Sequence, residues 1–395
     1  MRSEILVPIL FLLFLTVSTV SRVYLYYSTL NVIQAGHIEG LILSHPFEKD
    51  GYQNFQIKNI NIKVDPFPKY KLGDYVDVIV AKPSNERVLY RPKIELVNVK
   101  KVRVLNVISD YRFRLISIVK RNIPEPYSGL ILGMTIGYKD DFPSDFLDLL
   151  KRTGTIHIIV VSGYNVSIVI SGISIIFAMF GKRWNLLLSI IFVLIFAGLA
   201  GFDPPVVRAS IMGIIAVIGS SYGNHRFSLY ILYVTLASMV LVNPSYLTDI
   251  GFQLSAVATA TVIVSSMFIS GAKAFISTVF ITTFVNLAIF PIISYYFGTI
   301  SLISILSNLL VIWIIPFITF GGFFFFLFPV FLLKICLIIF IDFYLICIRL
   351  FGSLEFGYVQ YKFSIADMFI YYFVLLFGYL MIFKWKSYLN EKIAS

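Results

Sequence analysis

A stretch without charged residues places the strongest limit on what this chain can fold into. Residues 274–333 contain no Asp, Glu, Lys or Arg. A membrane-spanning helix needs about 20 predominantly apolar residues, so this stretch is long enough for two consecutive spans. The whole chain is 58% hydrophobic and 13% charged, whereas soluble domains carry about 25% charged residues. The sequence therefore predicts a polytopic α-helical membrane protein.

Long apolar runs predict about ten spans in total. Residues 1–27 form the first, and no small-residue cleavage site follows their apolar core, so we expect a retained N-terminal transmembrane anchor. The other spans are expected at residues 156–180, 184–201, 205–222, 227–243, 248–270, 274–298, 301–326, 330–352 and 365–384. Residues 153–330 would form the central membrane domain, and residues 331–395 further spans and a basic tail.

Residues 28–107 have a different composition and predict a β-domain. Apolar and polar residues alternate in 55–64 and 75–80, and a third run covers 93–104. Turn residues such as Lys49-Asp50-Gly51 and Gly73-Asp74 separate these runs. Several short strands in so few residues favour a small β-barrel, with an OB-like fold as the natural candidate.

Basic residues accompany aromatic residues in this β-domain. This combination suits nucleic acid, although it equally describes an ordinary solvated surface. The candidate DNA-contact residues are Lys58, Lys63, Lys69, Lys71, Arg87 and Arg91. The aromatic residues among them are Tyr52, Phe55, Phe67, Tyr70 and Tyr90.

Residues 108–152 predict short amphipathic helices that lie in the membrane interface. Their basic residues would contact lipid headgroups or collect a polyanion. These residues are Arg112, Arg114, Lys120, Arg121, Lys151 and Arg152.

The distribution of Lys and Arg predicts the orientation. With a cytoplasmic N-terminus, Lys182-Arg183, His225-Arg226 and Lys273 fall in cytoplasmic loops, whereas the opposite loops are poor in Lys and Arg. The positive-inside rule then predicts cytoplasmic N- and C-termini and a β-domain outside the cell membrane.

Polar side chains interrupt several of the predicted spans. Such residues usually face a bundle interior or a wet path, but they also hold helices together by hydrogen bonds. The candidate path residues are His157, Ser162, Asn165, Arg208, Asp249, Gln253, Asn286 and Asn308. Arg208 could reach the interface or meet a phosphate. Pro291 late in one span and Asn308 early in the next predict a locally broken, internally satisfied helix pair.

Four motifs in order resemble the ComEC-type competence family. They stand here as Gly154/Thr155/His157/Ser162/Gly163, Val207/Arg208/Ala209/Met212, Asp249/Gly251–Ser255 and Pro291/Phe297/Gly298/Ser301/Asn308/Pro316. Many members have Leu-His after the Ser-Gly pair, where this chain has Tyr164-Asn165. The N-terminal anchor and the OB-like domain extend the resemblance.

The resemblance implies a DNA-uptake channel core that passes single-stranded DNA across the cytoplasmic membrane during natural transformation. It also implies a DNA receptor, a helicase-like ATPase and a separate nuclease as partners, besides the lipid bilayer and a possible second copy of the chain. Larger members carry a C-terminal metallo-β-lactamase-like domain. The four histidines here form no His-x-His-x-Asp-His cluster, so we expect no nuclease chemistry, no enzyme activity, no metal and no cofactor.

Two other functions fit the residues less well. One is a membrane transporter of another solute, with the β-domain as a docking module. The other is an intramembrane enzyme that uses Ser162 and His157. Their separation of five residues places them about 140° apart on a regular helix, which is poor geometry for a nucleophile and its base.

Overall fold

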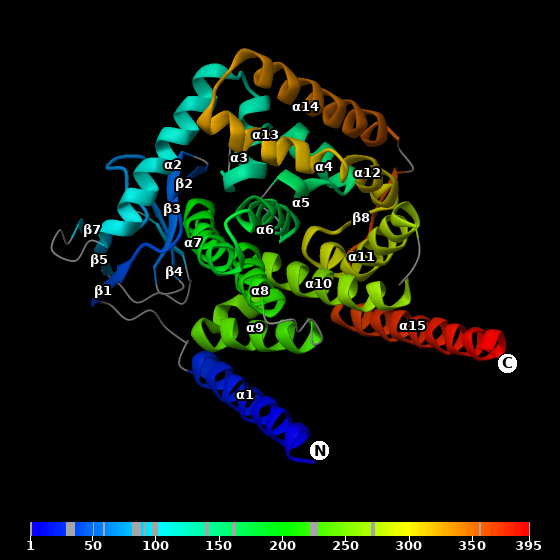
Figure 1. Ribbon diagram of the computed structural model, residues 1–395. Helices are drawn as coiled ribbons and strands as arrows, with labels where there is room; N and C mark the ends of the chain where they lie inside the picture. The colour runs from blue at the N-terminus through cyan, green and yellow to red at the C-terminus, as the bar shows by residue number, and fades with distance from the viewer. Residues whose placement is uncertain are drawn as a thin grey trace. The chain divides into compact units, whose positions relative to one another are not determined.

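A computed structural model gives the fold of this chain. It describes residues 2–28, 36–49, 51–57, 60–80, 88–90, 92–96, 102–138, 142–159, 163–221, 228–269, 273–354 and 357–394. Over these residues the chain is mostly helical and carries small β-sheets (Figure 1). It divides into two compact units. Unit 1 comprises Met1–Pro143, His157–Asp249 and Ile315–Asp342, and unit 2 comprises Ser144–Ile156, Ile250–Ile314 and Phe343–Ser395.

Unit 1 holds an N-terminal helix, the strands of the β-domain and a group of apolar helices. Its elements are α1 (Arg2–Ser28), β1 (Gly36–Leu41), β2 (Phe47–Lys49), β3 (Tyr52–Ile57), β4 (Ile60–Val64), β5 (Tyr75–Val80), β6 (Val88–Tyr90), β7 (Lys93–Leu96), α2 (Arg103–Asn122), α3 (Tyr127–Ile136), α6 (Gly163–Ala178), α7 (Lys182–Ala200), α8 (Pro204–Ser221), α9 (Ser228–Val242), the 3-10 helix η2 (Pro244–Thr248) and α13 (Ile315–Leu327).

Unit 2 holds further apolar helices and one small sheet. Its elements are α4 (Ser144–Thr153), α10 (Ile250–Phe268), α11 (Ala274–Phe297), β8 (Thr299–Ser301), α12 (Ser304–Val311), β9 (Tyr358–Gln360) and α15 (Ile365–Ala394). Two helices, α5 (Ile156–Ile159) and α14 (Phe331–Gly352), belong partly to each unit.

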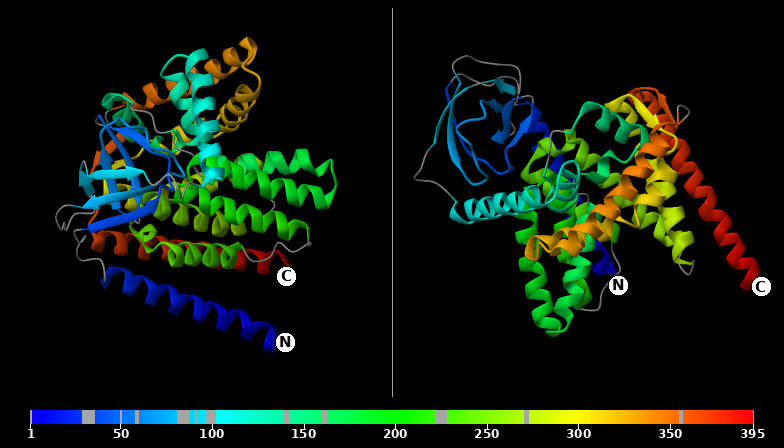
Figure 2. Two further views of the ribbon diagram at one scale, coloured as in Figure 1. Left: turned by 90° about the vertical axis from the view of Figure 1, so that its left-hand side faces the viewer. Right: turned by 90° about the horizontal axis from the view of Figure 1, so that it is seen from above.

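The strands of the β-domain form two sheets around one core. The strand orders are β1-β5-β7 and β2-β3-β4-β6, and Figure 2 shows these strands gathered around a common interior. Strands β3 and β4 pair antiparallel, with Phe55 opposite Ile62. Because neighbouring residues of a strand point to opposite faces, alternate residues of β3, β4 and β5 reach the core. The core residues are Ile42, Phe55, Ile57, Ile62, Val64, Tyr70, Val76, Val78, Val80 and Leu89.

The predicted strands are partly confirmed. The alternation in residues 75–80 is strand β5, and the run 55–64 contributes to the β3–β4 pair. The third run begins with β7, but Arg103 and Val104 are the first residues of helix α2. The alternating pattern extended the predicted strand too far because an amphipathic helix start can also mix apolar and polar residues. Closure into an OB-like barrel stays a prediction.

Helix α2 agrees in part with the predicted basic amphipathic helices, whereas helix α3 does not. Helix α2 is amphipathic, but Arg112 lies on its buried face with 5% exposure. Helix α3 is apolar and buried almost throughout. It packs closely on α13, where a Cβ on Gly322 would lie 2.5 Å from Cγ2 of Thr135. Small residues allow helices to approach this closely.

A second apolar core joins helices α6, α7 and α8 of unit 1. Its buried residues are Val166, Val169, Ile170, Ile173, Val193, Phe196, Ala197, Ala200, Val206 and Ala209. Helix α1 packs beside α9, where the hydroxyl groups of Thr16 and Tyr233 form a hydrogen bond. These contacts give unit 1 a continuous helical scaffold next to the β-domain.

Three helices in the described part of the chain are long and apolar enough to cross a membrane. They cover Arg183–Ala200, Phe275–Phe297 and Phe331–Gly352. Helices α12 and α13 add a fourth if the two count as one broken span. Shorter apolar helices cover Leu12–Tyr26, Tyr127–Ile136, Gly163–Ala178, Pro204–Ala216, Ser228–Val242, Ile250–Ser266 and Ile365–Gly378. The described chain is thus mostly helical, with apolar helices that fit a membrane protein, and ten spans stay a prediction.

Candidate functional site

The candidate path residues fall into several local contacts within the two units. Asn165 and Arg208 lie in unit 1, whereas Gln253, Asn286 and Asn308 lie in unit 2. His157 is in α5, but its side chain is outside the described part of the structure, as are Ser162, Lys58, Arg87 and Arg91. Asp249 follows η2 and immediately precedes Ile250, the first residue of α10. It therefore occupies the predicted position at a helix start, where a carboxylate complements the helix dipole.

Arg208 of α8 lies against Gly163 of α6. The Arg208 side chain is buried, with 5% exposure. A Cβ on Gly163 would lie 2.3 Å from Nη2 of Arg208, so a side chain at this position would displace the guanidinium group. Nη1 of Arg208 also donates to Sδ of Met212, 3.4 Å away. Gly163 of the first motif and Arg208 of the second therefore meet in space.

Asn165 holds α6 against α3. Its side chain is 1% exposed, and Nδ2 donates to the carbonyl oxygen of Met134 at 3.0 Å. Two helical turns later, a Cβ on Gly172 would lie 2.3 Å from Cζ of Phe320 in α13. The contact observed for Asn165 is thus an interhelical hydrogen bond, one of its two predicted roles.

Gly154 of the first motif, with the two residues before it, packs on serines in the region of the fourth motif within unit 2. Ser301 Oγ donates to the carbonyl oxygen of Arg152 at 2.5 Å, and Ser307 Oγ donates to that of Thr153 at 2.6 Å. Gly154 has φ +69°, and a Cβ there would lie 2.5 Å from Cβ of Ser304. A glycine is required both by this left-handed backbone and by the close approach. The serines therefore satisfy carbonyl groups at the C-terminal end of α4.

Helix α11 collects the remaining polar contacts of unit 2. Gln253 Nε2 of α10 donates to the hydroxyl oxygen of Tyr296 at 3.1 Å. Asn308 Nδ2 of α12 donates to Oδ1 of Asn286 at 2.9 Å, and Nδ2 of Asn286 donates to the carbonyl oxygen of Thr282 at 2.8 Å. The sequence predicts that polar groups of this helix pair bond to each other, and the bond from the Asn308 amide nitrogen to Asn286 confirms this for that atom. The first bond joins α10 to Tyr296 of α11, and the second joins α12 to Asn286 of α11.

The predicted break at Pro291 is wrong, because α11 continues through Pro291 to Phe297. Proline has no N–H, so the carbonyl oxygen four residues earlier, that of Leu287, loses its helical donor. The Tyr371 hydroxyl of α15 donates to this oxygen at 2.9 Å. The Tyr372 hydroxyl donates to the next carbonyl oxygen, that of Ala288, at 2.9 Å. A neighbouring helix therefore replaces the lost bond.

Ser294 ties the C-terminal part of α11 to the segment before α15. Its hydroxyl group donates to the carbonyl oxygen of Tyr361 and accepts from the N–H of Phe363 at 3.1 Å. The sequence did not reveal Ser294 as a bonding residue of α11, nor Tyr371 and Tyr372 as partners of that helix. The signal available for the tyrosines was Pro291 inside an apolar run, which requires an outside donor for Leu287.

Two lysines of the β-domain lie over exposed aromatic rings. Nζ of Lys63 is 5.0 Å from the ring centre of Tyr90, and Nζ of Lys69 is 5.7 Å from that of Phe67. Tyr90 is 61% exposed and Phe67 is 75% exposed. Lys69 also lies 3.4 Å from Glu48. By contrast, Phe55 and Tyr70 belong to the core and are not available for stacking.

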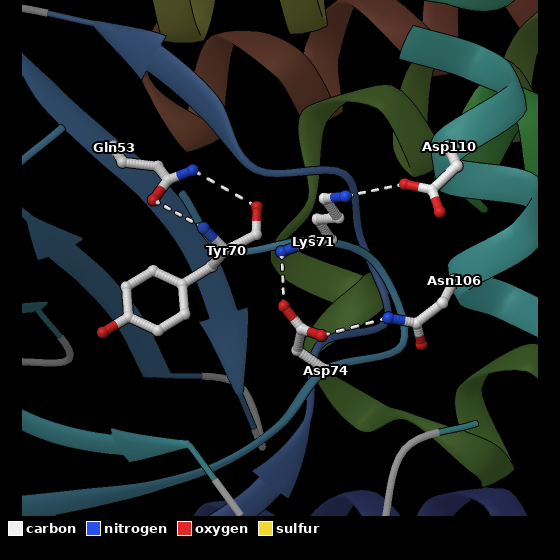
Figure 3. A network of polar contacts seen from close by, with 6 residues as sticks. All are labelled: Gln53, Tyr70, Lys71, Asp74, Asn106 and Asp110. Carbon is white, nitrogen blue, oxygen red and sulfur yellow. Dashed lines mark hydrogen bonds and ion pairs between the residues drawn. The ribbon is translucent and has the colours of Figure 1, made fainter. Parts of the chain in front are cut away.

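Lys71 attaches the β-domain to α2. Its Nζ is 2.6 Å from Oδ1 of Asp110 (Figure 3). The turn that carries Lys71 is fixed by Asp74, whose carboxylate accepts from the Lys71 N–H at 2.8 Å and from Asn106 Nδ2 at 3.1 Å. Gln53 bonds the backbone of Tyr70 on the other side of this turn. Lys71 therefore takes part in a structural joint.

A second joint lies at the C-terminal end of α7. Arg112 donates to the carbonyl oxygens of Ile136 and Leu199, at the ends of α3 and α7. His45 Nε2 lies 3.0 Å from the carbonyl oxygen of Gly198, so the neutral ring donates to it. Cations and donors at helix C-termini satisfy free carbonyl groups and complement the helix dipole.

A cavity of about 50 Å³ lies in this second joint. Charged and polar side chains line part of its wall, among them His45, Arg112, Tyr138 and Asp203. Burial, with the positive charge of Arg112, lowers the pKa of His45 to about 3, although the hydrogen bond to Gly198 opposes this shift. A buried base resists protonation in this way. The His45 side chain is therefore uncharged at neutral pH.

Comparison with known proteins agrees with the resemblance seen in the motifs. Residues 134–385 match the family described as Competence protein. ComE operon protein 3 of Bacillus subtilis (strain 168) is 27% identical over 212 residues, which cover 53% of this chain and 27% of that protein. Uncharacterized protein YcaI of Escherichia coli (strain K12) is 25% identical over 217 residues, which cover 50% of this chain and 28% of that protein.

The matches therefore span about a quarter of the length of these relatives. No solved structure matches the chain with significance. The family match covers the helices that carry all four motifs, from α5 to α13, and extends into α15. On the strength of this match, the chain belongs to the Competence protein family.

Proposed function

We propose that this chain acts in DNA uptake during competence and passes single-stranded DNA across the cytoplasmic membrane. Membership of the Competence protein family supports the role in DNA uptake. The observation that carries the finer proposal is the contact between Arg208 and Gly163. Arg208 lies in the apolar helix α8, where charged side chains are rare and mark substrate pathways, and a guanidinium group is well suited to contact phosphate.

The path would need weak, repeated polar contacts rather than tight binding. We assign Arg208 to a phosphate contact and the other candidate path residues to the wetting and shaping of the path. Asn165, Gln253, Asn286 and Asn308 would keep the helices in register through the hydrogen bonds described above. None of these residues is assigned a catalytic role, and a separate nuclease would degrade the strand that is not imported.

The β-domain, with an OB-like fold, would form the entrance on the outer side of the membrane. Exposed aromatic rings stack on unpaired bases, and neighbouring cations contact phosphates. Tyr90 with Lys63 and Phe67 with Lys69 provide two such pairs. Lys58, Arg87 and Arg91 keep their predicted role as DNA contacts, whereas Lys71 is engaged with Asp110.

A DNA receptor and a helicase-like ATPase would deliver and pull the strand. The termini would lie in the cytoplasm. The alternative, transport of another solute with the β-domain as a docking module, predicts no affinity for nucleic acid.

Binding of single-stranded DNA by the full-length protein in lipid nanodiscs tests the proposal. Affinity measured at rising salt should fall with a slope set by the number of phosphates neutralised. Tyr90→Ala and Phe67→Ala should each weaken binding by about 1–3 kcal/mol through lost stacking. Tyr75→Ala serves as the aromatic control, because Tyr75 lies outside the candidate set and its hydroxyl group bonds Glu39. Absence of salt-dependent binding would favour the solute transporter.

A further inference from the structure

We propose that helix α2 docks on the membrane surface and that its exposed face binds the headgroups of anionic phospholipids. This inference goes beyond DNA transport and depends only on the chain lying in a membrane. The sequence predicts interfacial helices over residues 108–152. The present inference concerns α2 alone, and the structure identifies its exposed side, which we call the α2 outer face.

The α2 outer face combines apolar and basic side chains at helical spacing. It consists of Val104, Val107, Tyr111, Arg114, Ile118 and Arg121. Steps of three and four residues place these positions on one side of a helix. Val104 is 67% exposed and Val107 is 66% exposed. Valine and tyrosine suit the headgroup boundary, and arginine suits phosphate.

The other faces of α2 are already occupied. Ser109, Arg112, Leu115 and Val119 are buried, and Arg112 contacts the ends of α3 and α7. Asn106 and Asp110 face the β-domain, where they bond Asp74 and Lys71 (Figure 3). The α2 outer face is the side that these contacts leave free.

The position of α2 relative to α7 matches the membrane interface. Figure 2 shows α2 running crosswise to α7 and α8, and α7 contains the candidate span Arg183–Ala200. The contact lies at the C-terminal end of that span, where a Cβ on Gly198 would lie 3.0 Å from Cδ1 of Ile108. A helix that crosses a span at its end lies along the membrane surface.

Charge favours an anionic membrane surface over a neutral one. Asp110 is the acidic residue in the α2 sequence, and Lys71 neutralises it at 2.6 Å. Lys120 is paired with Glu125 at 3.3 Å. Arg114 and Arg121 remain to contact lipid phosphates, because basic residues near an anionic membrane surface are attracted to it.

Spin labels on the full-length protein test the position of this face. In a background with Cys336→Ala and Cys347→Ala, Val107→Cys and Ile118→Cys would each carry a label. Reconstitution uses phosphatidylcholine vesicles with phosphatidylglycerol. Both labels should be more accessible to oxygen than to a water-soluble nickel complex. A label at Gln56→Cys, on an exposed position of β3, should show the opposite preference.

A second measurement tests the choice of anionic lipid. Phosphatidylglycerol added to the protein in detergent should raise the melting temperature, and Arg114→Gln/Arg121→Gln should lose that rise. Lys63→Gln, on the β-domain, should keep it. Labels with aqueous accessibility would overturn the proposal. Labels shielded from both reagents would also overturn it, because they would show that a protein covers the face, and an unchanged lipid response in the double variant would exclude the headgroup contact.

Discussion

The hydroxyl group of Tyr371 donates to the carbonyl oxygen of Leu287, the atom that Pro291 deprives of its helical partner. A proline of the fourth motif is therefore accommodated by a tyrosine from α15, about eighty residues later in the chain. The bond explains why α11 remains continuous through its proline. It also makes α15 a structural partner of the helix that carries Asn286, Ser294 and Tyr296.

A double-mutant cycle tests this relationship. Tyr371→Phe should lower the free energy of unfolding by about 0.6 kcal/mol, the average for hydrogen bonds between membrane helices, and by at most about 1.7 kcal/mol. In a Pro291→Ala background the same substitution should cost much less, because the introduced alanine supplies the missing N–H. Melting of the purified protein in detergent measures the four variants.

Tyr372→Phe is the matched control for this cycle. Its acceptor, the carbonyl oxygen of Ala288, has the N–H of Ile292 as its regular helical donor. Tyr372→Phe should therefore lower the free energy of unfolding by the same amount in the natural protein and in the Pro291→Ala background. An equal Tyr371→Phe loss in both backgrounds would show that Tyr371 does not compensate for the proline.

Gly163→Ala should destabilise the protein through its collision with Arg208. The expected cost is about 1–3 kcal/mol, as for other overpacked sites. Truncation of the partner in Arg208→Ala should remove most of this cost, because the guanidinium group no longer occupies the space. Melting of the single and double variants gives the coupling between the two positions.

Gly378→Ala provides the control for backbone effects. This glycine lies in α15, and a Cβ there would meet nothing within 4 Å. Alanine in a helix interior is favoured over glycine by about 0.5–1 kcal/mol, so stability should stay level or rise. Additive effects of Gly163→Ala and Arg208→Ala would contradict the proposed contact between the two motifs.

The stability of the protein should fall as pH decreases below 6.5, the ordinary pKa of His45. The folded protein holds the pKa of this buried ring near 3, so between these values the unfolded chain binds the proton more readily. The stabilising contribution of the uncharged His45 ring to the free energy of unfolding is therefore fully present above pH 6.5. It is lost progressively as the pH falls below that value. We expect a loss of about 1 kcal/mol or more at pH 5.

His45→Gln isolates this contribution because it keeps a donor for Gly198 and does not titrate. Arg112, Asp203 and Tyr138 also line the joint, and they are present in both proteins. Melting temperatures from pH 8 to pH 5 should thus fall more steeply for the natural protein than for the variant. Parallel curves would rule out His45 as the titrating group.

The helical membrane class, strand β5 and the helix start after Asp249 could be predicted because local patterns determine them. A charge-free run predicts spans, and alternation predicts strands. The burial of Arg112 could not be predicted, since its partners are carbonyl groups of α3 and α7 that lie far away in sequence. The long-range hydrogen bonds of Leu287, Ser301 and Ser307 could not be predicted for the same reason.

The four motifs could be recognised in the sequence, but the contacts between them in the folded protein could not be predicted. The first motif is divided between the two units. Gly154 contacts Ser304 of unit 2, whereas Gly163 contacts Arg208 of unit 1. Residues of one short motif thus serve two separate packing sites. The role of the candidate residues as a DNA path stays a prediction.

Uptake of labelled DNA in a strain that lacks the gene tests the central proposal most directly. We predict that DNA still binds the surface of the deletion strain but that none reaches a nuclease-protected state in the cytoplasm. The natural chain should restore uptake, whereas Arg208→Ala at equal membrane abundance should not. Normal cytoplasmic uptake in the deletion strain would contradict a role in passing DNA across the membrane.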